Sequence, residues 1–174
     1  MRADRARSTR LASIPMPLRV LAVVAVISLG TAGVAVATTG TGITTTTISV
    51  GALDQIRVRS NVDGHKVDID TKGTSDLYVV SNVIAPGGST GWHSHPGPSL
   101  ITVKSGTITE YEGDDPSCTP IVYTAGQSFV DPGGSHVHIL RNEGSVSAET
   151  IAVQIVATGA PRKIDEPAPG NCPF

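Results

Sequence analysis

Short runs of apolar and β-branched residues follow one another along most of the chain. From Ile48 to Ala157 these runs are rich in Val, Ile, Thr and Tyr, and they are separated by Gly, Pro, Asn, Asp and Ser. In "KVDID" (66–70) and "TITEY" (107–111), apolar and polar residues alternate with period 2, which is typical of a half-buried strand. No stretch of this region repeats apolar residues at the 3.6-residue spacing of a helix. The pattern predicts an all-β sandwich or barrel, and since no internal repeat is visible we expect a single barrel.

The first 37 residues form a different kind of segment, in which basic residues precede a long apolar run. Several arginines lie before "LRVLAVVAVISLGTAGVAVA" (18–37), which ends in the small-x-small sequence Ala35-Val36-Ala37. This order is typical of a secretory signal peptide. The run is also close to the roughly 20 apolar residues that span a bilayer, so an uncleaved membrane anchor is the alternative. In both cases the rest of the chain is expected to be secreted, or anchored on the outer side of the cytoplasmic membrane.

Composition divides the chain into four segments. We expect a leader over 1–37, a polar Thr/Gly-rich linker over 38–47, one β-barrel domain over 48–159, and a Pro-rich tail over 160–174. The leader holds five of the 13 basic residues and one of the 15 acidic residues, so the remainder has a net charge of −6. It has no cluster of Lys and Arg, which excludes a nucleic-acid partner. The expected partner is a small molecule, with membrane contact only through the leader, and a second copy of the chain is the other candidate.

The chain has two cysteines, Cys118 and Cys172. In an exported protein an even number of cysteines favours a disulfide, and two free thiols are the alternative. Cys172 lies in the Pro-rich tail, which has little apolar surface to hold it against the domain. A bridge to Cys118 would fix this tail and add about 2–4 kcal/mol of stability.

Four of the five histidines fall in two short segments. His93 and His95 lie two residues apart, as do His136 and His138, so each pair projects from one face of a strand. Imidazole is the commonest protein ligand of metals, and such pairs suit Fe, Mn, Zn, Ni or Cu. The alternative is that they are ordinary histidines on the outer face of the strands. His65 stands alone in a turn, and we expect it to be a surface residue.

The two histidine segments resemble the two sequence motifs of the cupin superfamily, in its small single-domain form. The first motif contains Gly, His-x-His, Glu and Gly, and here its Glu position falls on Ser99. The second contains Gly, Pro-x-Gly, His and Asn, and here one extra residue separates the Gly from the His. The resemblance covers Tyr78 to Ala157. The matching residues are Gly87, His93, His95 and Gly106 in the first motif, and Gly126, Pro132, Gly134, His138 and Asn142 in the second.

The resemblance implies a jelly-roll barrel that holds one divalent metal ion. The implied ligands are His93, His95 and His138, without the carboxylate of the family motif. Counting forward from Pro132 reaches Val137, whereas counting back from Asn142 selects His138. A loop absorbs an extra residue more easily than a strand, so we expect His138 to be the ligand. The candidate metal or substrate contacts are His136 at the rim, Ser99, Glu110 and Tyr111, and further candidates for the pocket are Trp92 and Arg141.

Three function classes follow from this resemblance. Cupins with three histidines resemble iron-dependent dioxygenases that act on thiols or aromatic diols. The alternative is a protein that binds a metal or small ligand at the cell surface without turning it over. A sugar isomerase is the third class, and it is disfavoured because those sites keep the glutamate that Ser99 replaces. Fold alone does not decide among them.

Overall fold

The computed structural model describes residues 36–174, which are all β and contain no helix. The predicted leader lies outside the described residues except for its last two positions. Across residues 36–174 there is no helix with the length and apolar character that crossing a bilayer requires.

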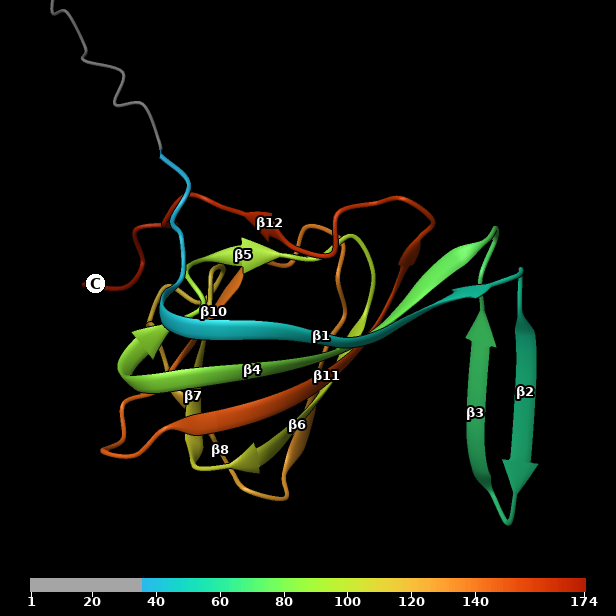
Figure 1. The fold of residues 1–174 in the computed structure, drawn as a ribbon, viewed down its shortest axis with the longest axis horizontal. Helices are drawn as coiled ribbons and strands as arrows, with labels where there is room; N and C mark the ends of the chain where they lie inside the picture. The colour runs from blue at the N-terminus through green and yellow to red at the C-terminus, as the bar shows by residue number, and fades with distance from the viewer. Residues whose placement is uncertain (1–35) are drawn as a thin grey trace, which may run out of the picture. The chain divides into compact units, whose positions relative to one another are not determined.

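Ten antiparallel strands form the barrel (Figure 1), and we describe them as two halves. Each half is a row of neighbouring strands, and most of the strands that pair are far apart in the sequence. The two halves join where Arg141 pairs with Ser89. In spatial order the first half is β1 (Thr41–Leu53), β4 (Ser75–Ser89), β11 (Ala148–Ala157), β6 (Ser99–Ser105) and β9 (Ser128–Asp131). The second half is β12 (Ile164–Asp165), β5 (His93–Ser94), β10 (His138–Arg141), β7 (Thr107–Glu112) and β8 (Ile121–Thr124).

A hairpin of β2 (Arg57–Val62) and β3 (His65–Asp70) forms a separate two-stranded sheet. It extends away from the barrel, and every one of its strand residues is exposed. Its turn is Asp63-Gly64, where both residues have positive φ, as a tight hairpin turn requires. His65 lies on this hairpin and is exposed.

The main core lies between the facing halves of the barrel. Strand β11 shows how the sequence builds it, because every second residue from Ala148 to Val156 is buried. Two of these inward residues, Thr150 and Gln154, are polar, and they face the cavity described below. The apolar core consists of Ile84, Ile101, Val103, Ile108, Phe129, Leu140, Ala148 and Ala152.

The predicted linker is wrong for residues 41–47, which lie in β1. Its threonines pair with β4 in a ladder that runs from Thr41 opposite Ser89 to Leu53 opposite Ser75. Thr is β-branched and favours extended backbone, and an edge strand with exposed side chains does not need an apolar pattern. The low hydrophobicity of residues 41–47 is therefore that of an exposed strand, and it does not indicate a linker.

The C-terminal tail is attached to the barrel at several points. Strand β12 pairs with β5, and the predicted disulfide joins Cys118 to Cys172. Both cysteines pack against a second apolar cluster of Trp92, Tyr111 and Ile139. This cluster faces away from the main core, and the tail covers it.

Candidate metal centre

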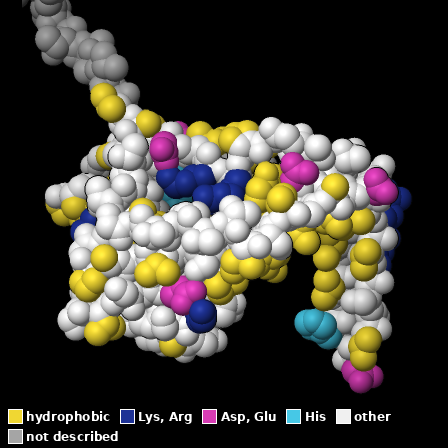
Figure 2. Space-filling model, in the orientation of Figure 1, with side chains coloured by type: hydrophobic (Ala, Val, Ile, Leu, Met, Phe, Trp, Pro, Cys, Tyr) yellow, Lys and Arg dark blue, Asp and Glu magenta, His cyan; other side chains and the backbone are white. Residues whose placement is uncertain are grey.

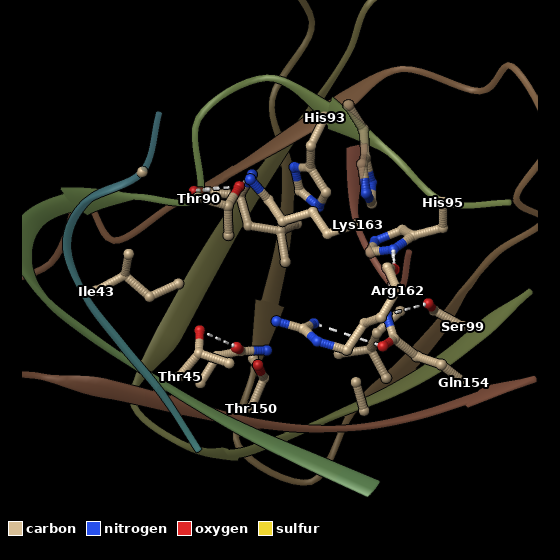
Figure 3. A pocket seen from close by; sticks show the side chains of 16 residues that line it. Ile43, Thr45, Thr90, His93, His95, Ser99, Thr150, Gln154, Arg162 and Lys163 are labelled. Atoms are coloured by element: carbon tan, nitrogen blue, oxygen red, sulfur yellow. Dashed lines mark hydrogen bonds between the residues drawn. The ribbon is translucent and has the colours of Figure 1, made fainter. Parts of the chain in front are cut away.

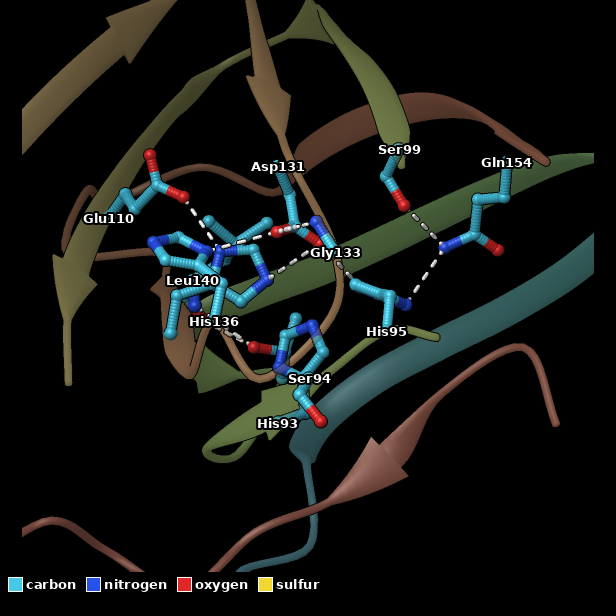
Figure 4. A network of polar contacts seen from close by, with 12 residues as sticks. His93, Ser94, His95, Ser99, Glu110, Asp131, Gly133, His136, Leu140 and Gln154 are labelled. Carbon is cyan, nitrogen blue, oxygen red and sulfur yellow. Dashed lines mark hydrogen bonds and ion pairs between the residues drawn. The ribbon is translucent and has the colours of Figure 1, made fainter. Parts of the chain in front are cut away.

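Three histidines meet inside the barrel, where β5 and β10 lie side by side. His93 on β5 is the register partner of His138 on β10, and His95 follows two residues after His93. One ring nitrogen from each lies within 4.8 Å of those of the other two, and all three residues are buried. Figure 4 shows His93 and His95 at this place, with the neighbouring polar groups.

Each of these imidazoles is held through its Nδ1 atom. His93 Nδ1 lies 2.9 Å from the Gly91 carbonyl, and His95 Nδ1 lies 2.7 Å from the Arg162 carbonyl. His138 Nδ1 lies 2.7 Å from Glu110 Oε1. The closest partner of each Nδ1 is an acceptor, so each Nδ1 carries the hydrogen and each Nε2 keeps a free lone pair. Gln154 Nε2 also lies 3.2 Å from His95 Nδ1, farther than the Arg162 carbonyl. This is the arrangement by which proteins orient metal-binding histidines.

Burial favours the neutral form of the His93 and His95 rings. The pKa of His93 is well below its ordinary value, because burial disfavours the charged form and His138 and His95 add like-charge repulsion. The pKa of His95 is also lowered, first by burial, although the Arg162 carbonyl and Asp131 oppose the shift. Metal ligation requires neutral imidazole, so this environment prepares both rings for it.

Asp131, the last residue of β9, is fully buried beside the histidines. Its Oδ1 accepts a hydrogen bond from the Gly133 N–H at 2.9 Å and lies 3.0 Å from His136 Nδ1. Its Oδ2 lies 3.7 Å from His95 Nε2 and 3.9 Å from His138 Nε2. The structure thus places a carboxylate next to two of the three rings, on a strand that carries none of them (Figure 4).

His136 lies in the loop before β10, outside the three-histidine cluster. Its Nε2 lies 2.7 Å from Glu112 Oε2, and its Nδ1 faces Asp131. Burial alone would lower the pKa of His136, but the hydrogen bond with Asp131 and the charge of Glu112 outweigh it and raise the pKa. His136 therefore lies between two carboxylates that favour its charged form, and it does not line the cavity of the cluster.

A close approach of two loops brings His95 and Asp131 together. Gly97 follows β5 and Gly133 follows β9, and a Cβ on Gly133 would lie 2.4 Å from the Gly97 backbone. Gly133 also has a φ of +75°, a conformation that other residues adopt at a cost. Only glycine allows the two backbones to approach this closely.

A cavity of about 150 Å³ opens onto the three histidines (Figure 3). Its wall combines apolar residues such as Ile101 and Leu140 with polar ones. On one side Gln154 Nε2 donates to Ser99 Oγ at 2.9 Å. Arg162 and Lys163, from the segment before β12, also line the cavity. Figure 2 shows Lys and Arg side chains gathered at one place on this face of the barrel.

The structure separates the predicted contacts into two groups. Ser99 is fully buried and lines the cavity, and Glu110 is buried behind His138 without lining it. The expectation that Tyr111 contacts metal or substrate needs correction. Tyr111 lies between two inward residues of β7, so it points to the opposite face, where its hydroxyl donates to Glu143 Oε1 at 3.0 Å.

Trp92 and Arg141 also lie outside the cavity. Trp92 precedes the inward His93 and belongs to the apolar cluster under the tail. The Arg141 guanidinium stacks 3.9 Å above the ring of Phe174. Both residues alternate with inward-facing neighbours, and this alternation directs them outward.

The sequence reasoning did not find Asp131, Gln154 or Arg162. Two of them carried a usable signal: Asp131 shares its strand face with the apolar Phe129, and Gln154 alternates in step with Ala152 and Val156. Arg162 comes from an irregular segment, so no periodicity could place it.

The donor set fits a divalent metal ion. Three imidazoles present lone pairs on Nε2, and His138 Nε2 has no hydrogen-bond partner although it is buried. An unpartnered buried nitrogen is costly unless something binds it. Imidazole ligands suit Fe, Zn, Ni, Cu or Mn.

The comparisons with known proteins agree with this architecture. Residues 82–154 match the family model described as the cupin domain. No curated protein matches the chain significantly. Among solved structures, peruvianin-I, a cysteine peptidase from Thevetia peruviana latex, is 23% identical with a TM-score of 0.48, over 73% of this chain and 68% of that one.

Two other solved structures are similar to parts of the chain. A double-stranded β-helix protein from Klebsiella pneumoniae is 22% identical with a TM-score of 0.45, over 65% of this chain and 84% of that one. An oxalate oxidase is 25% identical with a TM-score of 0.40, over 47% of this chain and 46% of that one. Likeness at this level says nothing about activity. The all-β barrel, the two histidine segments and the matched residues 82–154 show that this chain contains a cupin domain.

Proposed function

We propose that this chain is an exported, metal-dependent dioxygenase that acts on a small anionic molecule. The observation that carries the proposal is the set of three oriented histidines, each with a free Nε2, facing a cavity of about 150 Å³. A cavity of about 150 Å³ can hold a benzene ring, so this one suits a small molecule. When bound, an iron-type ion would supply the binding positions for O2 and for the substrate, and its redox chemistry.

The residues of the chain supply position and an enclosed environment. The Nδ1 hydrogen bonds fix the three rings, and the Gln154–Ser99 hydrogen bond fixes the polar wall. Apolar side chains such as Ile101 and Ala152 form part of the cavity wall. An enclosed, partly apolar site strengthens electrostatic interactions with whatever binds there.

Arg162 supports a negatively charged substrate. No carboxylate within residues 36–174 forms an ion pair with its guanidinium, whose polar contact is with Gln154 Oε1 at 3.5 Å. Burial lowers the pKa of Arg162, which shows that its charge is partly removed from water. Lys163, in contrast, pairs with Asp165. A carboxylate on the substrate would give the Arg162 guanidinium the partner that it lacks.

The disulfide supports export. Disulfides persist in oxidising compartments, and Cys118–Cys172 accounts for both cysteines of the chain. The basic and apolar pattern of residues 1–37 points the same way.

A second function is favoured by one specific feature of the cavity. In the part of the chain that the structure describes, none of the residues that line the cavity is an Asp or a Glu. Without a carboxylate on the cavity wall to act as acid or base beside the ligand, metal-dependent binding without turnover is the competing function.

Metal content and oxygen uptake decide between the two. We expect purified protein to hold close to one metal ion per chain, and a His93→Ala/His95→Ala variant to lose it while keeping its β-type circular dichroism. Full metal retention in that variant would show that the site assignment is wrong. The iron-loaded protein should consume O2 with thiols or catechols that bear a carboxylate, and Arg162→Gln should raise KM for these more than for uncharged analogues. Stable metal without oxygen uptake on any of them would favour the binding function.

A further inference from the structure

Asp131 is a buried carboxylate with one unused oxygen. The residue is fully buried, and its Oδ2 has no hydrogen-bond partner. The groups within 4 Å of its carboxylate that carry ionisable nitrogen are His95, His136 and His138, and no Lys or Arg of residues 36–174 is among them. A buried carboxylate oxygen without a hydrogen-bond or charge partner is costly, so a positively charged or hydrogen-bonding partner is expected in front of Oδ2.

Two imidazole nitrogens lie within 4 Å of this oxygen, and one of them, His138 Nε2, is also buried without a hydrogen-bond partner. Oδ2 lies 3.7 Å from His95 Nε2 and 3.9 Å from His138 Nε2. These distances exceed those of an N–H···O hydrogen bond, which are about 2.7–3.2 Å. Two atoms that each lie about 2.1 Å from one metal ion are separated by about 3.0–4.2 Å, depending on the angle between them. The spacing therefore fits ligands that share one ion.

We infer that Asp131 is the fourth protein ligand of the metal centre, through Oδ2. This inference rests on the proposed metal binding by His93, His95 and His138, and it extends the ligand set by one carboxylate. Asp131 on β9 is the register partner of Ser99 on β6. Ser99 occupies the position where a carboxylate was expected, so Asp131 supplies that carboxylate from the neighbouring strand.

The surroundings of Asp131 direct Oδ2 toward the histidines. Its other oxygen, Oδ1, is already engaged by the Gly133 N–H and by His136 Nδ1. The close approach of Gly133 to Gly97 holds this loop against the one that follows His95. Two contacts on one oxygen and a packed backbone leave the carboxylate little freedom to turn.

A carboxylate in the ligand set changes which metals the site prefers. Oxygen ligands favour Mn and other hard ions, whereas a purely imidazole set favours Cu and Zn. Three histidines and Asp131 would leave two positions of a six-coordinate ion for a chelating substrate, or for one substrate atom and O2. The net charge of the metal ion and its ligands would also be one unit lower than with three neutral histidines alone.

The affinities of Mn²⁺ and Zn²⁺ for wild type, Asp131→Asn and Glu110→Gln test the inference. The Asn side chain keeps an oxygen that can accept from the Gly133 N–H and places an NH₂ group where Oδ2 was. We expect Asp131→Asn to weaken Mn²⁺ binding more than 100-fold. The loss of Zn²⁺ affinity in the same variant should be about ten times smaller. Glu110→Gln is the matched control, because it changes a carboxylate that contacts His138 at Nδ1, the ring nitrogen that faces away from the metal. Glu110→Gln should weaken the binding of both ions equally, by about 10–100-fold.

Equal losses of Mn²⁺ and Zn²⁺ affinity in Asp131→Asn, or no loss, would overturn the inference. Wild type that binds neither ion would instead overturn the proposed function itself, so the two failures are distinguishable. If Asp131→Asn does not fold, Mn²⁺-loaded wild type with ¹³C in its aspartate carboxyl groups decides. Electron-nuclear double resonance should then show a ¹³C coupling from a directly bound carboxylate, and its absence would overturn the inference.

Discussion

Removal of the Cys118–Cys172 disulfide tests how the tail contributes to stability. The change is the double substitution Cys118→Ser/Cys172→Ser, in which both residues keep a similar size. The bridge joins residues 54 apart in sequence, so in the unfolded chain it closes a long loop. By the chain-entropy relation a loop of this length corresponds to about 4 kcal/mol. For a domain of this size such a loss lowers Tm by about 8–16 °C.

The folded state should persist in this variant, because other contacts hold the tail. Asn171 Nδ2 donates to the backbone carbonyls of Glu112 and Asp115 at 2.8 and 2.6 Å. Phe174 packs against Tyr111 with the ring centroids 5.0 Å apart. The loss is therefore expected to arise mainly in the unfolded state, with the circular dichroism spectrum unchanged.

Urea denaturation measures both parts of this prediction. The free energy of unfolding should fall by about 4 kcal/mol. The dependence of that free energy on urea should become steeper, because the unfolded chain without the bridge exposes more surface. A loss below about 1 kcal/mol would refute the loop-entropy reasoning. Loss of the folded spectrum would show that the tail needs the bridge in order to dock.

Two further predictions concern the metal centre. Without metal, the free energy of unfolding should fall as the pH drops from about 6.5 to 5. In this range His93 takes up a proton in the unfolded chain, whereas in the folded chain its lowered pKa keeps it from doing so. In urea titrations at several pH values, His93→Asn should lessen this fall by up to about 1.4 kcal/mol per pH unit, and an unchanged slope would contradict it. Gly133→Ala should weaken metal affinity at least tenfold because its Cβ would lie 2.4 Å from Gly97, whereas Gly134→Ala, at a similar φ but with nothing within 4 Å, should not. Equal affinities in the two variants would argue against the close approach as the cause.

Most of the strands could be predicted from the sequence because a half-buried strand alternates. The run "ETIAVQIVA" became β11 with the expected alternation of burial. The run "TITEYE" became β7, whose four central residues are all buried, so both of its faces are covered. Residues 41–47 could not be recognised in this way. Strand β1 pairs only along one edge, its side chains are mostly exposed, and its order comes from backbone hydrogen bonds to β4. Backbone hydrogen bonding carries no hydrophobic signature.

The site was predictable only where a strand sets the direction of the side chain. His93 and His95 could be paired from their spacing, and strict use of the same alternation would have excluded Tyr111 once Glu110 was taken as inward. Arg162 reaches the cavity from the segment between β11 and β12, which has no regular structure. Its position depends on how the tail folds back over β5, and no local pattern in the sequence specifies that.

The position of the extra residue in the second motif shows the same distinction between strands and loops. Asn142 follows β10, and its Nδ2 donates to the carbonyls of Ile84 and Val146, both at 2.8 Å. This anchor fixes the end of β10, so counting back from it places His138 and Leu140 on the inward face. The residues between Pro132 and His138 form a loop with two positive-φ glycines, and a loop can lengthen without turning a strand over. Spacing measured along a strand from a buried anchor therefore predicts side-chain direction, whereas spacing measured across a loop does not.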